Sequence, residues 1–556
     1  MLSHRLHGVL PLLVVFFFAA CSPQPKGEQF ITGKIWTGNQ DSPWAGAMVI
    51  NGDSIVAIGS AEELQHWVGS NTRIEKHDST ELIVPGLIDC HTHFVEGGMR
   101  LSSVQLRDAK TPAEFIRRIA AYAKTLKPGE WILGGDWDHQ HWGGILPKKE
   151  WVDSVTRDNP LWVQRLDGHM GLANSLALQR AGITENTRDV AGGAIVRDKG
   201  KITGILKDNA TKLVDRHIPA PTAEQFDRAL QAAMQYVASN GITSIHSVTG
   251  SDYGNSFDVF ERAKAAGKLI TRIYAADSLS AWSKLREQIN KNGRGDNWVK
   301  YGMLKGFVDG SLGSHTAAFW QPFTDAPQDS GFYVIHLDTL YQYIQRADKA
   351  GLQVTVHAIG DKSISKLLDI FERVEKENGP RDRRFRMEHA QHIRLADLPR
   401  FAQLGVIASV QPYHAIDDGR WAEKFIGHER ALTTYAFQSL LAAKAKLAFG
   451  SDWFVAPASP MEGIYAAVTR RTIDDKNPDG WIPSQKTSVE DALRAYTMGA
   501  AFASFDEHKK GSLEKGKLAD FTVLEKNIFS IAPETIRTVR VLETVVGGKT
   551  VFQQKK

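Results

Sequence analysis

Short apolar runs of strand length, separated by segments with helical periodicity, make up most of the chain. The runs cover residues 82–90, 241–248, 269–276, 303–310, 352–358, 384–390, 405–412 and 446–452. Between them, segments such as 361–379 and 396–405 repeat their apolar residues at helical spacing. Eight strand–helix units are the content of a (β/α)8 TIM barrel, so the pattern predicts an α/β fold of this type.

Strands that alternate apolar and polar residues flank this region at both ends of the chain. They occupy residues 30–74, with Asn51-Gly52-Asp53 as a hairpin turn, and return at 511–526 and 539–552. Two such segments pair most economically with each other, because separate hairpins would leave unpaired edges. We therefore predict a small β-sandwich-like domain built from residues 29–84 and 506–556, with the barrel spanning 85–505.

The gap between the first and second barrel strands, about residues 95–240, is far too long for one connection. It contains further strand-like runs and a helical segment at 221–240. We expect a mixed α/β insertion over the barrel mouth, where long inserts shape substrate access.

The N-terminus has the features of an export signal. Arg5 provides a positive start, residues 9–20 form an apolar run, and Cys21 closes the segment. This run is too short to span a membrane, so residues 1–21 are predicted to be a signal peptide and 22–28 a tether. The boundary resembles a bacterial lipobox with Cys21 as the lipidated residue, although Phe18 replaces the usual Leu. The expected location is the periplasmic side of the cell envelope, anchored to the membrane, with a soluble periplasmic protein as the alternative.

Composition narrows the classes of partner and of scaffold that fit this chain. The 556 residues carry a formal net charge of only +4, and no basic stripe interleaved with aromatic residues appears, which argues against nucleic acid as a partner. Two cysteines rule out a disulfide framework. The sequence leaves the oligomeric state open.

Polar residues gather where the predicted barrel strands end. His91 and His93 are two residues apart, so along a strand both imidazoles point to the same side. Four later predicted strands each contribute one more polar residue, within the strand or at its end: Lys305, His357, His389 and Asp452. Strand ends of a barrel meet on one face, and imidazoles with a carboxylate suit zinc, iron, nickel or manganese.

Together, the segments PGLIDCHTHF, DGSLGSHTA, VHAIGD, MEHAQ and GSDW, with the inserted DGHMGLANSLAL, resemble the amidohydrolase superfamily. The resemblance is to its YtcJ-like branch, amidohydrolase family 3, which includes an N-substituted formamide deformylase. It implies two divalent metal ions, most simply zinc: one on His91, His93 and Asp452, the other on His357 and His389. Lys305 would bridge them as a carboxylated lysine. The alternative is a salt bridge from Lys305 to Asp309 and a site with one metal.

The chemistry expected of such a site is hydrolysis of a non-peptide C–N bond, in an amide or an N-acyl or N-formyl group of a small molecule. A metal ion lowers the pKa of bound water to roughly 7. Asp452 can then accept the proton of that water and pass it to the leaving nitrogen. Two alternatives remain: a mononuclear deaminase of the same fold, and a substrate-binding lipoprotein without turnover.

Other residues are weaker candidates. His169 matches a family position near the substrate, and Asp309, Ser311 and His315 follow the fourth strand, where they would line the pocket or form its turn. Glu388 points away from His389 along the strand, so hydrogen bonding to a ligand or within the buried core is expected of it rather than ligation. Two further histidines are interpreted as surface or loop residues: His392 and His414.

Overall fold

The computed structural model describes residue 2 and residues 26–165, 170–190, 193–249, 256–313 and 315–554. The predicted signal peptide apart from residue 2, the first part of the tether, the lipidation site Cys21 and His169 lie outside the described residues. No helix within the described ranges has the length and apolar character that crossing a membrane requires.

Eight parallel strands form the barrel sheet. In order around the sheet they are β6 (Leu87–Thr92), β13 (Ile242–Ser247), β14 (Arg272–Ser278), β15 (Val299–Phe307), β16 (Gln353–Ala358), β17 (Arg386–His389), β18 (Ile407–Val410) and β19 (Lys446–Phe449). Between β19 and β6 the sheet is nearly closed by a parallel bridge from Thr92 to Trp453, just past the last strand. Each of the eight predicted apolar runs overlaps one of these strands, which confirms the predicted α/β barrel.

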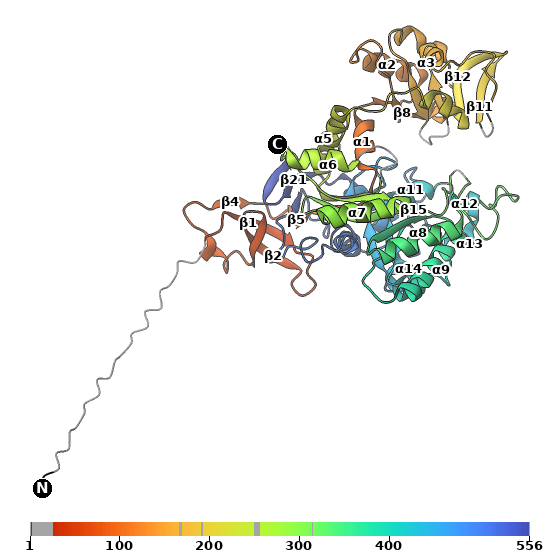
Figure 1. The fold of residues 1–556 in the computed structure, drawn as a ribbon. Helices are drawn as coiled ribbons and strands as arrows, with labels where there is room; N and C mark the ends of the chain where they lie inside the picture. The colour runs from red at the N-terminus through yellow and green to blue at the C-terminus, as the bar shows by residue number, and fades with distance from the viewer. Residues whose placement is uncertain are drawn as a thin grey trace.

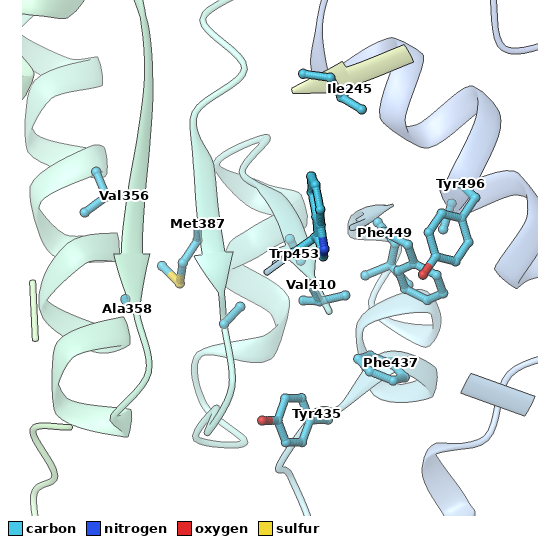
Figure 2. Close-up of a cluster of buried hydrophobic side chains, with 14 of the residues drawn as sticks. Ile245, Val356, Ala358, Met387, Val410, Tyr435, Phe437, Phe449, Trp453 and Tyr496 are labelled. Carbon is cyan, nitrogen blue, oxygen red and sulfur yellow. The ribbon is translucent and has the colours of Figure 1, made fainter. Parts of the chain in front are cut away.

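Helices follow the barrel strands and bury apolar faces against them. The longer ones are α5 (Ala223–Ser239), α6 (Ser256–Ala265), α7 (Trp282–Asn292), α8 (Leu337–Lys349), α9 (Asp361–Asn378) and α15 (Pro460–Thr469). The shorter ones are α1 (Phe94–Leu101), α10 (Leu398–Gln403), α11 (Pro412–Asp418), α12 (Ala422–Ile426), α13 (His428–Ala431), α14 (Phe437–Ala442), α16 (Val489–Arg494) and α17 (Ala500–Ala503). Thr222 and Gln225 cap α5 reciprocally, and Gly379, at a φ of 78°, ends α9. Figure 2 shows part of the core that strands and helices share, including Met387 on β17 and Phe437 on α14.

The two ends of the chain form one mixed sheet. Its strands are β1 (Gln29–Trp36), β2 (Trp44–Asn51), β3 (Ser54–Gly59), β4 (Arg73–Lys76), β5 (Leu82–Pro85), β20 (Phe521–Leu524), β21 (Val541–Val546) and β22 (Lys549–Gln553). The order is β22-β21-β20-β5-β1-β2-β3, with β4 also beside β1. Early and late strands therefore share one sheet, as the red and blue strands at one side of the barrel show (Figure 1).

The run 82–90, predicted as one strand, is two strands in different sheets. Gly86 separates β5, in the terminal sheet, from β6, in the barrel. A Cβ atom at Gly86 would lie 2.3 Å from Oγ1 of Thr243, so only glycine fits where the chain passes against β13.

Between α1 and α5 the chain forms a third sheet, which stands off the barrel (Figure 1). Its strands are β7 (Val104–Gln105), β8 (Gly134–Trp137), β9 (Trp162–Arg165), β10 (Met170–Ala173), β11 (Gly193–Asp198) and β12 (Lys201–Asp208). Its helices are α2 (Pro112–Ala123), α3 (Ser175–Arg180) and α4 (Lys212–Asp215). The unit has apolar clusters of its own, around Phe115 and around Leu206.

Candidate active site

The end of β6 supplies the first two candidate ligands. His91 is its second-last residue and His93 follows the strand, and each directs its Nε2 atom at the same oxygen of Asp452. The distances to Oδ1 of Asp452 are 3.3 Å from His91 and 3.2 Å from His93. Asp452 comes just past β19, and its amide donates to the carbonyl oxygen of His91 (2.8 Å), which fixes the two strand ends together.

The donor atoms fit a divalent cation. Oδ1 of Asp452 is buried and has no hydrogen-bond partner among the described residues, although two imidazole nitrogens lie near it. The ligand atoms of His91, His93 and Asp452 all lie within 4.8 Å of one another. A buried carboxylate oxygen is costly to leave without a partner, and a metal ion bound by these three residues would supply one.

The imidazoles of His91 and His93 are both held in orientation by a contact at the Nδ1 atom. His91 donates from Nδ1 to Oε2 of Glu388 (2.5 Å), and Nδ1 of His93 lies 3.1 Å from the hydroxyl of Thr249. The Nε2 atoms are thereby left to face Asp452, as expected of metal-binding histidines whose second nitrogen is held by a hydrogen bond.

Glu388 belongs to a fully buried polar network beneath the site. It accepts hydrogen bonds from Arg386, from Ser409 (2.6 Å) and from Thr355. Burial alone would raise the pKa of Glu388, but the charges of Arg386 and His91 hold it well below its ordinary value. A permanent carboxylate is thus kept against His91, in the supporting role expected from the sequence.

Lys305 on β15 extends its side chain to the Nε2 atom of His91. It is 4% exposed, and its Nζ atom lies 3.3 Å from Nε2 of His91. Burial lowers the pKa of Lys305 to about 8, which raises the share of neutral amine at physiological pH. The alternative partner Asp309 is otherwise engaged, because its carboxylate accepts hydrogen bonds from the backbone N–H groups of Ala318, Ile359 and Gly360.

His357 and His389 lie beside this centre. Their ring centroids are 4.4 Å apart, and the His389 ring is 4.9 Å from that of His91. Burial lowers the pKa of His357 to about 3 and that of His389 well below its ordinary value, so both rings are neutral and able to act as ligands. Nε2 of His357 lies 2.9 Å from the carbonyl oxygen of Gly310, so ligation through this atom would require the ring to turn.

His414 is a site residue that the sequence interpretation missed. It lies in α11, directly after β18, and its Nε2 is 3.2 Å from Oδ2 of Asp452. Its ligand atom is also within 4.8 Å of those of His389 and Asp452. The surface interpretation is wrong for His392 too, which is 2% exposed and contacts the Thr434 hydroxyl through Nδ1 (2.8 Å).

The predicted substrate residues after β15 differ in their places: Oδ1 of Asp309 lies 3.8 Å from Nε2 of the candidate ligand His357. His315 pairs with Asp325 (3.0 Å) and packs between the rings of Phe323 and Phe425. Ser311 is exposed in the turn, where its amide donates to the Thr316 hydroxyl (3.0 Å). Burial raises the pKa of Asp309 to about 6. Their roles in substrate binding stay predictions.

A cavity of about 1340 Å³ opens above the centre, and His93 and Lys305 are part of its wall. The barrel side is completed by residues such as Arg100, Phe307 and Phe454. The opposite wall comes from the unit between α1 and α5, with Tyr122 on α2 and with Trp131 and Leu133 just before β8. The space accommodates a small organic molecule with a sizeable apolar part.

An eight-stranded α/β barrel whose strand ends bring imidazoles, a lysine and a carboxylate together at the base of a cavity defines the class of metal-dependent barrel hydrolases. The chain belongs to the amidohydrolase family: the description of that family matches residues 81–552. The family resemblance and the prediction of a hydrolase are thereby confirmed.

Relatives cover nearly the whole chain. Protein LONG AFTER FAR-RED 3 of Arabidopsis thaliana is 40% identical over 94% of this chain and 90% of its own length. The putative amidohydrolase YtcJ of Bacillus subtilis and the N-substituted formamide deformylase of Arthrobacter pascens are 30% and 26% identical, each over 94% of this chain and 98% of theirs. An uncharacterized metal-dependent hydrolase from Pyrococcus furiosus has a similar crystal structure (TM-score 0.75, 28% identity, 90% of this chain and 100% of that one).

Proposed function

We propose that this protein hydrolyses a C–N bond, other than a peptide bond, in a small molecule bound in the cavity above Asp452. The observation that carries the proposal is the buried Oδ1 atom of Asp452, which lies between the Nε2 atoms of His91 and His93 without a hydrogen-bond partner among the described residues. One of the relatives is named N-substituted formamide deformylase, and this name supports an amide or N-formyl substrate.

The proposed metal set is His91, His93 and Asp452, with Lys305, His357 and His389 for a second ion. Divalent ions there, zinc in the first instance, would supply activated water and polarise the substrate carbonyl. Asp452 takes the proton of the attacking water and delivers it to the leaving nitrogen. His414, 3.2 Å from its Oδ2 atom, positions the carboxylate for this transfer. The walls of the cavity hold the substrate and limit access of bulk water.

Asp452→Asn tests the proton-transfer role. The amide keeps the shape of the side chain but cannot act as a base for the proton of the water, so we expect kcat to fall by several orders of magnitude. Amine release from a panel of N-acyl amino acids, formamides, cyclic amides and dipeptide-like amides, with zinc-, manganese- or iron-loaded enzyme, measures the effect. Asp227→Asn, in an exposed ion pair with Arg262, is the control. Largely intact turnover in Asp452→Asn would contradict the assignment.

Lys305 is proposed to carry a carboxylate group. Its neutral Nζ adds CO₂ and releases one proton, which replaces a costly buried cation by an anionic ligand. Lys305→Ala is expected to abolish activity, and bicarbonate with a short-chain carboxylic acid should restore part of it. Full activity of Lys305→Ala without any addition would refute this role.

Metal content separates the alternatives. About two equivalents per chain favour the hydrolase with a bridging lysine, and one equivalent favours a mononuclear deaminase-like site. If metal supplementation leaves the protein without bound metal and without turnover, a substrate-binding protein is favoured.

We also propose that Cys21 is lipidated and anchors the enzyme at the periplasmic side of the envelope. Support comes from the sequence of residues 1–21 alone. Metabolic labelling with a fatty acid, compared between the natural chain and Cys21→Ala, tests the anchor. An unlabelled natural chain recovered in the soluble periplasmic fraction would contradict it.

A further inference from the structure

A second cluster of metal-ligating side chains lies in the terminal sheet, outside the barrel. Glu75 is on β4, His77 follows that strand, and Glu543 is on β21. One ligand atom of each lies within 4.8 Å of the other two. The cluster joins strands from the two ends of the chain.

His77 is prepared for ligation. Its Nδ1 lies 3.0 Å from Oε2 of Glu81, so this nitrogen carries the hydrogen and donates it. The other nitrogen, Nε2, then has a free lone pair; it is fully buried and has no hydrogen-bond partner among the described residues. A histidine held by a carboxylate through one nitrogen while the other awaits a partner is the usual arrangement of a metal ligand.

Glu543 supports the same interpretation. The residue is 7% exposed, and within the described ranges no cationic side chain forms an ion pair with it. Thr550 donates to its Oε1 atom (2.5 Å), which leaves Oε2 available. Glu75 pairs with Arg73 through Oε1 (2.6 Å), and Arg73 is about half exposed. Two carboxylates close together in a largely buried position repel each other, and a cation between them removes this repulsion.

We propose that Glu75, His77 and Glu543 bind a divalent transition-metal ion, zinc in the first instance, that fastens the N-terminal strands to the C-terminal ones. One imidazole with two carboxylates and no thiolate suits zinc. Zinc ligands lie about 2.0–2.2 Å from the ion and hence at most about 4.4 Å apart. Small side-chain rotations close the set around the ion. The site is structural, because it lies in a different sheet from the catalytic residues.

The test measures zinc by mass spectrometry in a His91→Ala/His93→Ala background, which removes the first barrel ligands. After zinc loading and desalting, addition of His77→Ala or Glu543→Gln is expected to remove about one equivalent per chain. His66→Ala, an exposed histidine of the same domain, is the matched control and should keep the metal. Equal zinc content with and without His77→Ala would overturn the proposal.

Thermal unfolding provides a readout that does not depend on the background. Zinc should raise the midpoint of the natural chain more than that of Glu75→Gln, because an ion that binds only the folded state stabilises it. Glu75 is partly exposed, so this variant is expected to fold even where Glu543→Gln does not. Identical zinc-induced shifts in the natural chain and Glu75→Gln would also refute the site. The single variant His77→Ala, in which His91 and His93 are intact, should retain amine release. This result would separate the site from the proposed catalytic function.

Discussion

Asp520→Asn is expected to loosen the attachment of the terminal sheet to the barrel. Asp520 directly precedes β20, and its carboxylate accepts from Nε (2.7 Å) and Nη2 (2.9 Å) of Arg272, the first residue of β14. It also accepts from the amide of Gly547 (2.8 Å). The two charged side chains are 3% and 4% exposed, so the pair is excluded from water.

The magnitude follows from leaving Arg272 as an uncompensated buried cation. Breaking a buried pair at one partner costs about 3–5 kcal/mol of unfolding free energy. Asparagine keeps the shape and one acceptor, so we expect about 3 kcal/mol, a change of about a hundredfold in the ratio of folded to unfolded protein.

Urea unfolding followed by tryptophan fluorescence and by far-UV circular dichroism, with all proteins in excess chelator, measures this cost. Coincident transitions for the two probes justify a single free energy. The control is Asp227→Asn, which breaks the exposed pair of Asp227 with Arg262 (2.7 Å; 48% and 41% exposed) and should cost at most about 1 kcal/mol. Arg272→Met added to Asp520→Asn should recover stability. Equal losses in Asp520→Asn and Asp227→Asn would refute the reasoning.

Two further predictions concern buried carboxylates. Glu388→Gln weakens the hold on Nδ1 of His91, so metal affinity or activity should fall about 10–100-fold, measured by titration with a competing chelator; unchanged affinity would contradict the orienting role. Burial raises the pKa of Asp418 to about 6, despite donors from Tyr435 (2.6 Å) and Gln391 (2.9 Å). Because the folded state holds this proton more tightly than the unfolded chain, the contribution of Asp418 is fully present below about pH 4 and is lost as the pH rises through 6, by at most about 3 kcal/mol. Asp418→Asn should flatten that part of the profile of unfolding free energy against pH, and an unchanged slope would exclude Asp418 as its source.

The barrel could be predicted because each strand is buried on both faces and therefore appears as a short continuous apolar run. The same reasoning failed at Gly86. The run 82–90 is apolar apart from Asp89, which follows Gly86, so periodicity could not show that the chain leaves one sheet and enters another there. The separation depends on contact with Thr243, which is far away in the sequence.

The candidate ligands could be found because they stand at the ends of recognisable strands. His414 was missed for the opposite reason, since it lies four residues after Val410 in the first turn of a helix, and its approach to Asp452 depends on how α11 leaves β18. A search of the first helical turn after each strand would have found it. The cluster around His77 joins residues from both ends of the chain, and spacing along the sequence cannot reveal such a set.

The pairing of β5 with β20 has a consequence for biosynthesis. Leu82 to Pro85 face Leu524 to Phe521 in antiparallel register, and on the other side β5 meets β1 at a single residue pair. A nascent chain that lacks its final strands therefore exposes the backbone groups of β5 directly before the histidines of the active site. Such unpaired edges recruit other chains. Until β20 has been synthesised, the open edge of β5 is therefore a site where aggregation can begin.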